Sequence, residues 1–154
     1  MTLPTSSWDE YAMKIMRVSD SDFPIAVNVY RESWRESHRD VCTPEFMENR
    51  DYAGYLMRIQ KDLFGIYDPE LVGVFSLVGN NFGNLYIHPT HWRNGYGAAC
   101  VQYAMEQNSK LRLTVLSSNS KAIGLYHKMG FRFTGNDIPL RDGLFEREMQ
   151  YSRT

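Results

Sequence analysis

Residues 85–98 read LYIHPTHWRNGYGA, and this stretch decides how the rest of the chain is organised. The apolar residues Leu85, Tyr86 and Ile87 predict the end of a strand, and Pro89 stops that strand two positions later. A short loop follows with Gly95 and Gly97, and apolar residues at helical spacing begin directly behind it. The stretch therefore predicts a strand, a short loop and the start of a helix.

The glycine loop has the chemistry of an anion site. Glycines let backbone N–H groups approach a ligand closely, and the first turn of a helix presents unpaired donors at its positive end. This arrangement suits a pyrophosphate. It is neither a dinucleotide fingerprint nor a P-loop, because the third glycine and the Gly-Lys-Ser/Thr ending are missing. A tight turn without a ligand is the alternative interpretation.

The chain on either side of this stretch alternates between strands and helices. Ahead of it we expect a strand over 12–18, helices over 23 to about 33–35 and 43 to about 60, strands over 63–67 and 71–78, and a turn over 79–84. After it we expect helices over 95–108 and 119–129, with strands over 111–116, 131–134 and 144–151. This order predicts an α/β (α+β) fold, in which a mixed, largely antiparallel central sheet of about seven strands has helices on both faces.

Length and composition indicate one globular domain. The 154 residues predict a single domain over 1–154, with 1–11 as a short N-terminal extension. The chain is 43% hydrophobic and 23% charged, and neither a membrane-spanning apolar stretch nor a signal peptide is found. Cys42 and Cys100 lack C-x-x-C spacing, which argues against a disulfide framework or a zinc site. We therefore expect a soluble, cytoplasmic protein without a metal.

Positive charge is concentrated in one segment of a nearly neutral chain. Residues 91–132 contain six basic side chains and one acidic side chain, whereas the net charge of the whole chain is −1. This distribution suggests a localised anionic ligand, and chance clustering of exposed lysines is the alternative. Binding of nucleic acid through this segment is disfavoured by the pI near 6.4.

A second informative stretch, residues 119–131, reads NSKAIGLYHKMGF. Asn119 and Tyr126 are seven positions apart, so they lie on the same side of a helix, about two turns from one another. An amide and a phenol at this spacing could reach different parts of one elongated ligand. Taken singly, Asn119 could be an ordinary N-cap and Tyr126 an ordinary core residue.

Together the two stretches resemble the GNAT superfamily of acetyl-CoA-dependent N-acetyltransferases, over roughly residues 13–151. The family's loop, Gln/Arg-x-x-Gly-x-Gly/Ala, is matched by residues 92–97 except at its first position, where Trp92 stands. The family's later helix, Asn-x-x-Ala-x-x-x-Tyr-x-x-x-Gly-Phe, is matched at every defining position. The matching residues are Asn119, Ala122, Tyr126, Gly130 and Phe131.

The resemblance implies acetyl-CoA as cosubstrate and direct transfer of its acetyl group to a primary amine. By resemblance, the backbone of Leu85, Tyr86 and Ile87 would pair with the pantetheine arm. Asn119 would touch the pantetheine or phosphate region, and Tyr126 would face the sulfur and protonate the departing thiolate as general acid. The backbone amides implied to hold the pyrophosphate are those of Arg93, Asn94, Gly95, Tyr96, Gly97 and Ala98.

Direct transfer requires neither a metal nor a covalent enzyme intermediate, so we expect Cys100 to be core packing and Cys42 a loop thiol. An alkylamine with a pKa of about 10.4 must lose a proton before it attacks. The candidate bases are Glu32, His38, His88 and His91, and the sequence does not choose among them.

The resemblance places the acceptor site at about residues 34–43 and 135–144. The acidic residues of these segments favour a cationic acceptor, and the basic residues weaken that inference. The acidic residues are Glu36, Asp40, Asp137 and Asp142, and the basic residues are Arg35, Arg39 and Arg141.

Two functions remain open on the sequence. The first is an N-acetyltransferase that acts on a small molecule or peptide, with no nucleic acid or membrane partner. The second is a non-catalytic acyl-CoA-binding module, a sensor or an interaction module, and Trp92 is its support. In the N-terminal extension, Trp8 and Tyr11 could cover either a partner subunit, as in a homodimer, or the protein's own core.

Overall fold

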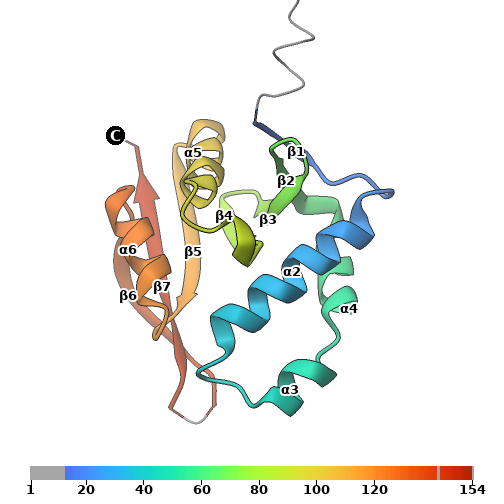
Figure 1. The fold of residues 1–154 in the computed structure, drawn as a ribbon. Helices are drawn as coiled ribbons and strands as arrows, with labels where there is room; N and C mark the ends of the chain where they lie inside the picture. Colours follow the sequence, from blue (N-terminus) through green and yellow to red (C-terminus); the bar gives the residue numbers. More distant parts are fainter. Residues whose placement is uncertain (1–12, 142, 154) are drawn as a thin grey trace, which may run out of the picture. The chain divides into compact units, whose positions relative to one another are not determined.

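The computed structural model describes residues 13–141 and 143–153, and its strands form one sheet in the order β1-β2-β3-β4-β5-β7-β6 (Figure 1). The β4–β5 pair is parallel, whereas β1–β2, β2–β3, β5–β7 and β6–β7 are antiparallel. This mixed, mostly antiparallel sheet confirms the expected fold class. The strands are β1 (Lys14–Arg17), β2 (Leu63–Tyr67), β3 (Leu71–Val78), β4 (Asn81–Ile87), β5 (Lys110–Leu116), β6 (Arg132–Pro139) and β7 (Phe145–Ser152).

Five α-helices and two short 3-10 turns connect these strands in the described residues. The helices are α2 (Phe23–His38), α3 (Pro44–Asn49), α4 (Tyr52–Met57), α5 (Tyr96–Gln107) and α6 (Ser120–Lys128), and the turns are η1 (Gln60–Asp62) and η2 (Pro89–His91). None of the described helices is long and apolar enough to cross a membrane.

By its internal contacts the chain divides into two compact units. The first unit contains the described residues up to Ser76 together with Asn84–Gly97, and the second contains Leu77–Gly83 and the described residues from Ala98 onward. The expected single domain stays a prediction. The expected N-terminal extension, with Trp8 and Tyr11, lies outside the described residues, as does Asp142.

In the first unit, α2 packs its apolar stripe against α4 and strands β2 and β3. Ala26, Val29, Tyr30 and Trp34 are buried at helical spacing, which agrees with the helix expected there. Ile25, the neighbour of Ala26, is 51% exposed, because Ala26 takes the inward position. The remaining members of this core are Val18, Met47, Tyr52, Leu56, Leu63, Tyr67, Leu71 and Val74.

In the second unit, β5 buries Leu111, Leu113 and Val115 in strict alternation, which agrees with the strand expected over 111–116. Helix α5 buries one face, formed by Cys100, Val101 and Ala104. Cys100 is fully buried, in agreement with its expected role in core packing.

The expected helix over 43–60 is wrong in its continuity, because the chain forms two short helices there. Thr43 caps α3 by accepting a hydrogen bond from the Phe46 amide, and Asp51 caps α4 by accepting one from the Gly54 amide. Arg50, between the two helices, has extended backbone (ψ 136°) and so ends α3. Helix α2, by contrast, runs one turn further than expected, and the side chains of Ser37 and His38 bond carbonyls of its last turns.

Two further boundaries differ from the expectation. Strand β4 begins at Asn81, so the expected turn over 79–84 shrinks to Gly79, which has a φ of +60°, and Asn80. Strand β6 continues to Pro139 rather than ending at Thr134. The register shifts at a bulge between Phe133 and Asp137, where Gly135 has a φ of +90°, and β6 continues beyond it.

Candidate functional site

The predicted strand–loop–helix stretch exists in the first unit as β4, η2 and the start of α5. After Ile87, the His88 amide donates to the Val72 carbonyl of β3, and η2 follows at once. Arg93 and Gly95 then adopt positive φ angles of 71° and 79°. This left-handed backbone is easy for glycine and costly for most other residues, so Gly95 has a conformational reason to occupy the position at which α5 begins.

Trp92 closes this loop. Its indole Nε1 donates a hydrogen bond of 2.6 Å to the carbonyl of Ile87, the last residue of β4. The loop is further held by Asn94 Nδ2, which donates to the His91 carbonyl at 3.1 Å. The side chain that departs from the family's usual Gln or Arg therefore has a structural role in the loop.

Tyr96 links the first residue of α5 to the β2–β3 connection. Its phenol donates to Asp68 Oδ2 at 2.6 Å, and this hydrogen bond raises the pKa of Tyr96. The phenol is therefore committed to holding the start of α5. The contribution of Tyr96 to an anion site is limited to its backbone amide.

In the second unit, Asn119 is the N-cap of α6. Its Oδ1 accepts a hydrogen bond of 3.2 Å from the Ala122 amide, as the cap interpretation of the sequence expected. The side-chain Nδ2 group is not used by this cap. Asn119 can therefore cap α6 and still donate to a ligand.

The end of α6 explains the Tyr-x-x-x-Gly-Phe spacing physically. Gly130, with a φ of +102°, donates to the His127 carbonyl at 3.1 Å, and the Phe131 amide donates to the Tyr126 carbonyl at 2.9 Å. These two bonds form a Schellman cap, in which Phe131 contacts the residue whose carbonyl it caps. The rings of Tyr126 and Phe131 are 5.7 Å apart. The cap thus positions the Tyr126 ring from its C-terminal side.

Tyr126 is buried, with 7% of its surface exposed. Burial is the main cause that raises the pKa of the Tyr126 phenol, and the neighbouring Cys100 thiol adds to it. The phenol therefore stays protonated at neutral pH and can donate a proton or a hydrogen bond. Burial also raises the pKa of the Cys100 thiol, which makes Cys100 unsuited to nucleophilic attack.

Two of the four candidate bases, His88 and His38, differ in which ring nitrogen carries the proton. His88 Nδ1 accepts from the Thr90 amide as the cap of η2, so the ring proton belongs on Nε2. His38 Nδ1 lies 2.8 Å from the Trp34 carbonyl, which requires the proton on Nδ1 and leaves Nε2 as the basic atom.

Burial is the main cause that lowers the pKa of His38. The hydrogen bond to the Trp34 carbonyl acts in the opposite direction, and the positive charge of Arg50 lowers the pKa further. His38 is therefore neutral at pH 7 and can accept a proton at Nε2. Glu32 and His91 make contacts of other kinds. Glu32 is paired with Arg31 at 3.5 Å, and the His91 ring lies edge-on to those of His88 and Tyr96.

Three of the charged residues predicted for the acceptor segments form ion pairs. Glu36 and Arg39 form an ion pair of 2.9 Å at the end of α2. Asp137 pairs with Arg147 at 3.6 Å between β6 and β7, so residues 135–139 belong to a strand rather than to a loop. Arg50, which no sequence pattern indicated, lies among aromatic residues of α2 and α4. Tyr52 and Tyr55 are near Arg50 in the sequence, but the other two rings belong to Tyr30 and Trp34, in a different helix.

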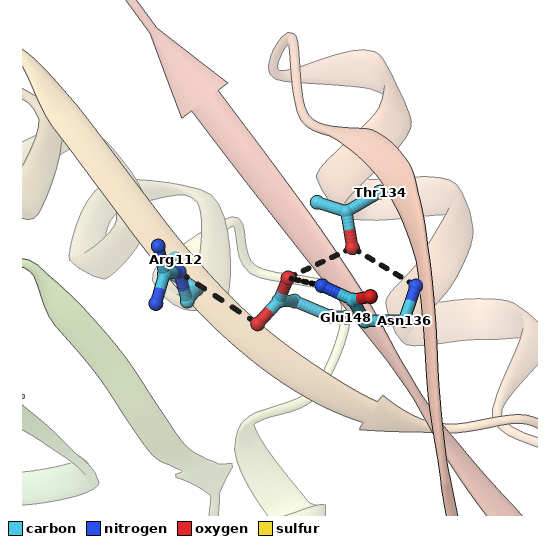
Figure 2. A network of polar contacts seen from close by, with 4 residues as sticks. All are labelled: Arg112, Thr134, Asn136 and Glu148. Atoms are coloured by element: carbon cyan, nitrogen blue, oxygen red, sulfur yellow. Dashed lines mark hydrogen bonds and ion pairs between the residues drawn. The ribbon is translucent and has the colours of Figure 1, made fainter.

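A polar network joins β5, β6 and β7 beside the bulge (Figure 2). Glu148 of β7 accepts hydrogen bonds from Thr134 Oγ1 at 2.8 Å and Asn136 Nδ2 at 3.0 Å. Arg112 of β5 adds an ion pair at 3.7 Å. The bonds from Asn136 and Thr134 lower the pKa of the Glu148 carboxyl, and Arg112 contributes less. The carboxylate thus holds the two arms of the bulge together.

This network predicts a pH dependence of stability. Because the folded-state pKa of Glu148 is lowered, its contribution is present above the unfolded-state pKa of about 4.3 and is lost as pH falls through the folded-state value. Thermal melts of Glu148→Gln should therefore fall less steeply with acid than those of the wild type. Glu106→Gln, on an exposed position of α5, is the matched control. Equal acid slopes for Glu148→Gln and the wild type would contradict the prediction.

No group of three or more His, Cys, Asp or Glu side chains that could hold a metal is found within residues 13–141 and 143–153. Cys42, expected as a loop thiol, lies between α2 and α3 and is half-buried.

Of the residues implied to bind acetyl-CoA, those from Leu85 to Gly97 belong to the first unit, and Ala98, Asn119 and Tyr126 belong to the second.

Comparison with known proteins gives a family match across most of the chain. The model of the acetyltransferase (GNAT) family matches residues 23–131. Among curated proteins, the peptidyl-lysine N-acetyltransferase YjaB of Salmonella typhimurium is 36% identical over 66 residues, or 43% of this chain and 46% of that protein. The match therefore spans less than half the length of this relative.

Two solved structures share the fold over nearly the whole chain. A PaiA N-acetyltransferase from Thermoplasma acidophilum, in complex with coenzyme A, has 21% identity and a TM-score of 0.72, covering 92% of this chain and 99% of that one. The apo form of YjaB from Escherichia coli has 21% identity and a TM-score of 0.75, covering 93% and 99% of the two chains.

Proposed function

Because the chain belongs to the acetyltransferase (GNAT) family, we propose that it transfers an acetyl group from acetyl-CoA to a primary amine. The acceptor is a small molecule or a peptide, and the amine attacks directly within a ternary complex. The name of the YjaB relative, a peptidyl-lysine N-acetyltransferase, supports an amine acceptor. The coenzyme A bound to the Thermoplasma protein supports the choice of cosubstrate.

The observation that carries the proposal is the loop between β4 and α5. Gly95 takes a left-handed conformation at the point where the helix begins, so the loop turns directly into the first helical turn. The N–H groups of a first helical turn have no intrahelical partner and favour a negatively charged ligand. A pyrophosphate fits this arrangement.

We assign the cofactor contacts accordingly. The backbone of Leu85, Tyr86 and Ile87 would bind the pantetheine arm, and the amides of residues 93–98 would bind the pyrophosphate. Asn119 would donate to the cofactor through Nδ2, the group its cap leaves unused. Acetyl-CoA supplies an activated thioester, and the chain supplies the groups that bind it and move protons.

Two side chains are suited to the proton transfers. Tyr126, kept protonated by burial, would protonate the departing thiolate. His38, neutral and with Nε2 as its basic atom, is our candidate to accept the proton of the attacking amine. A water chain between His38 and the amine is compatible with this role.

The test of the cosubstrate is a thermal melt with and without acetyl-CoA. A ligand at 100 times its dissociation constant adds about 2.7 kcal/mol, which should raise the melting midpoint by roughly 5–10 °C. The shift should be absent with adenine nucleotides that lack the pantetheine arm. No shift at millimolar acetyl-CoA would contradict the proposal.

A positive melt leaves the non-catalytic acyl-CoA-binding module as the alternative. Release of free thiol in the presence of an amine panel separates the two functions, because only an acetyltransferase consumes acetyl-CoA. The departure at Trp92 was the support for this alternative. Because Trp92 forms a hydrogen bond to Ile87, it has a structural role in the loop that is compatible with either function. A cytoplasmic location and a homodimer stay predictions.

A further inference from the structure

Arg50 occupies a cage of aromatic rings in the first unit. Its guanidinium carbon lies 4.1 Å from the ring centroid of Trp34 and 4.2 Å from that of Tyr55. Tyr52 and Tyr30 complete the cage at 4.9 and 5.3 Å. Three segments contribute, namely α2, α4 and the break between α3 and α4. Cation–π contacts of this kind hold a guanidinium in place without using its N–H donors.

The hydrogen bonding of Arg50 is incomplete. Its Nη2 donates to the Tyr30 hydroxyl at 2.7 Å. Its Nη1 is buried and has no hydrogen-bond partner among the described residues. Buried polar groups are ordinarily paired, and an unpaired donor on a charged group is unfavourable. The site is therefore short of an acceptor, and a carboxylate matches a guanidinium best because it can accept two parallel bonds.

Arg50 also lines an open hollow of about 440 Å³. The other lining residues are Thr43, Glu45, Phe46 and Asn49. Arg50 and Glu45 both line this hollow, and a pair of residues of opposite charge favours a ligand that carries both signs of charge and disfavours a polyanion. An amine with a carboxylate on the same molecule has this charge pattern.

The cage connects to the strand end assigned to the cofactor. Tyr30, which accepts the Nη2 bond, lies edge-on to Tyr86 of β4, with ring centroids 5.1 Å apart. Helix α2, which contributes Tyr30, also lies beside η2, the turn that follows β4. Arg50 is thus separated from β4 by a single intervening side chain.

We propose that Arg50 binds a carboxylate of the acceptor, so that the preferred substrates are amines that carry a carboxylate on the same molecule. This inference rests on the proposed acetyltransferase function and specifies its substrate class. Arg50 sets specificity, and Tyr30 is a positioning residue that fixes the guanidinium through its hydroxyl.

The test compares acceptors that differ only in charge. A series of ω-amino acids of increasing chain length is assayed beside the corresponding carboxamides, with thiol release as the readout. For the best chain length, kcat/KM should be about 10- to 100-fold higher for the carboxylate, the range expected of a hydrogen-bonded charged group. A ratio near one in the wild type would overturn the inference without any variant being needed.

Variants then assign the preference to Arg50. In Arg50→Gln the carboxylate-to-carboxamide ratio should fall to near one, and in Arg50→Lys it should stay intermediate, because a single ammonium cannot form the paired bonds. Arg58→Gln is the matched control, since Arg58 lies 5.2 Å over the same Tyr55 ring but is exposed and does not line the hollow. If Arg50 only holds the helices together, Arg50→Gln lowers both rates equally and the ratio persists, which would overturn the inference.

A binding measurement separates this inference from the proposed function. We would titrate 6-acetamidohexanoate and its carboxamide by calorimetry, because these compounds bind without being acetylated. Saturable binding of the carboxylate alone, lost in Arg50→Gln, supports the anion subsite even if no amine is acetylated. Absence of that binding overturns it, even if acetyl transfer to other amines establishes the proposed function.

Discussion

Replacing Tyr126 by Phe is expected to lower kcat by about 100-fold or more while leaving the affinity for acetyl-CoA nearly unchanged. The substitution removes one hydroxyl and keeps the ring, so the packing against Phe131 at 5.7 Å is preserved. What is lost is the proton that the phenol would give to the departing thiolate. A general acid acts mainly in the transition state, so the loss should appear in kcat.

The measurement is steady-state thiol release with a reactive amine, beside calorimetric titration of acetyl-CoA. Tyr151→Phe is the matched control, because Tyr151 packs against the same Phe131 at 5.6 Å and also loses only a hydroxyl. A fall of less than about threefold in kcat for Tyr126→Phe would exclude Tyr126 as general acid. Equal losses in both variants would indicate a packing defect instead.

The raised pKa of Tyr126 adds a pH criterion. Because burial holds the folded-state pKa above the unfolded value of about 10, the phenol keeps its proton throughout the neutral range. The general-acid contribution is therefore present below about pH 10 and is lost only as pH rises through the folded-state value. If kcat falls between pH 7 and 9, the group whose titration causes that fall must be one other than Tyr126.

Much of the fold could be predicted because local signals and tertiary packing agree. Apolar and polar residues alternate over 111–116, which predicts a strand, and the apolar residues of 119–129 have helical spacing, which predicts a helix. Both elements form there. Asn119 and Gly130 carry the capping chemistry of α6, so its limits could be read from residue type alone. The predictions failed where a short polar side chain or a glycine changed the backbone locally. Asp51 starts a new helix within the expected 43–60 helix, and Gly135, with a φ of +90°, permits a bulge where a strand end was expected.

Some residues of the candidate site could likewise be predicted from the sequence, and others could not. Its glycine loop and α6 motif are continuous in sequence, so both could be compared directly with the family's patterns, and the resemblance implied their roles. The Arg50 cage is built from three segments, and its members meet only when α2 and α4 pack together. The sequence showed Trp92 only as a departure from the family's loop pattern. Its structural role, the hydrogen bond to the Ile87 carbonyl, could not be predicted, because a bond across five residues of irregular loop leaves no periodic pattern in the sequence.

Phe131→Ala should produce the largest loss of stability among the residues of the motif. Phe131 is fully buried, and its ring packs between Tyr126 and Tyr151 at 5.7 and 5.6 Å. Truncating a buried Phe to Ala costs about 3–5 kcal/mol, since apolar contacts are lost and a cavity remains. The melting midpoint should fall by roughly 10 °C or more for a chain of this length.

The same substitution should also impair the reaction, because Phe131 is the side chain that the Schellman cap places against Tyr126. Below the melting transition, kcat of Phe131→Ala should therefore fall although the Tyr126 hydroxyl is intact. Phe131→Leu, which keeps a large apolar group, should lose less than about 1.5 kcal/mol and retain most of kcat. Chemical denaturation and thiol release measure the two effects separately. A change in unfolding free energy below about 1 kcal/mol for Phe131→Ala would mean that the cap, rather than the ring, supports the end of α6.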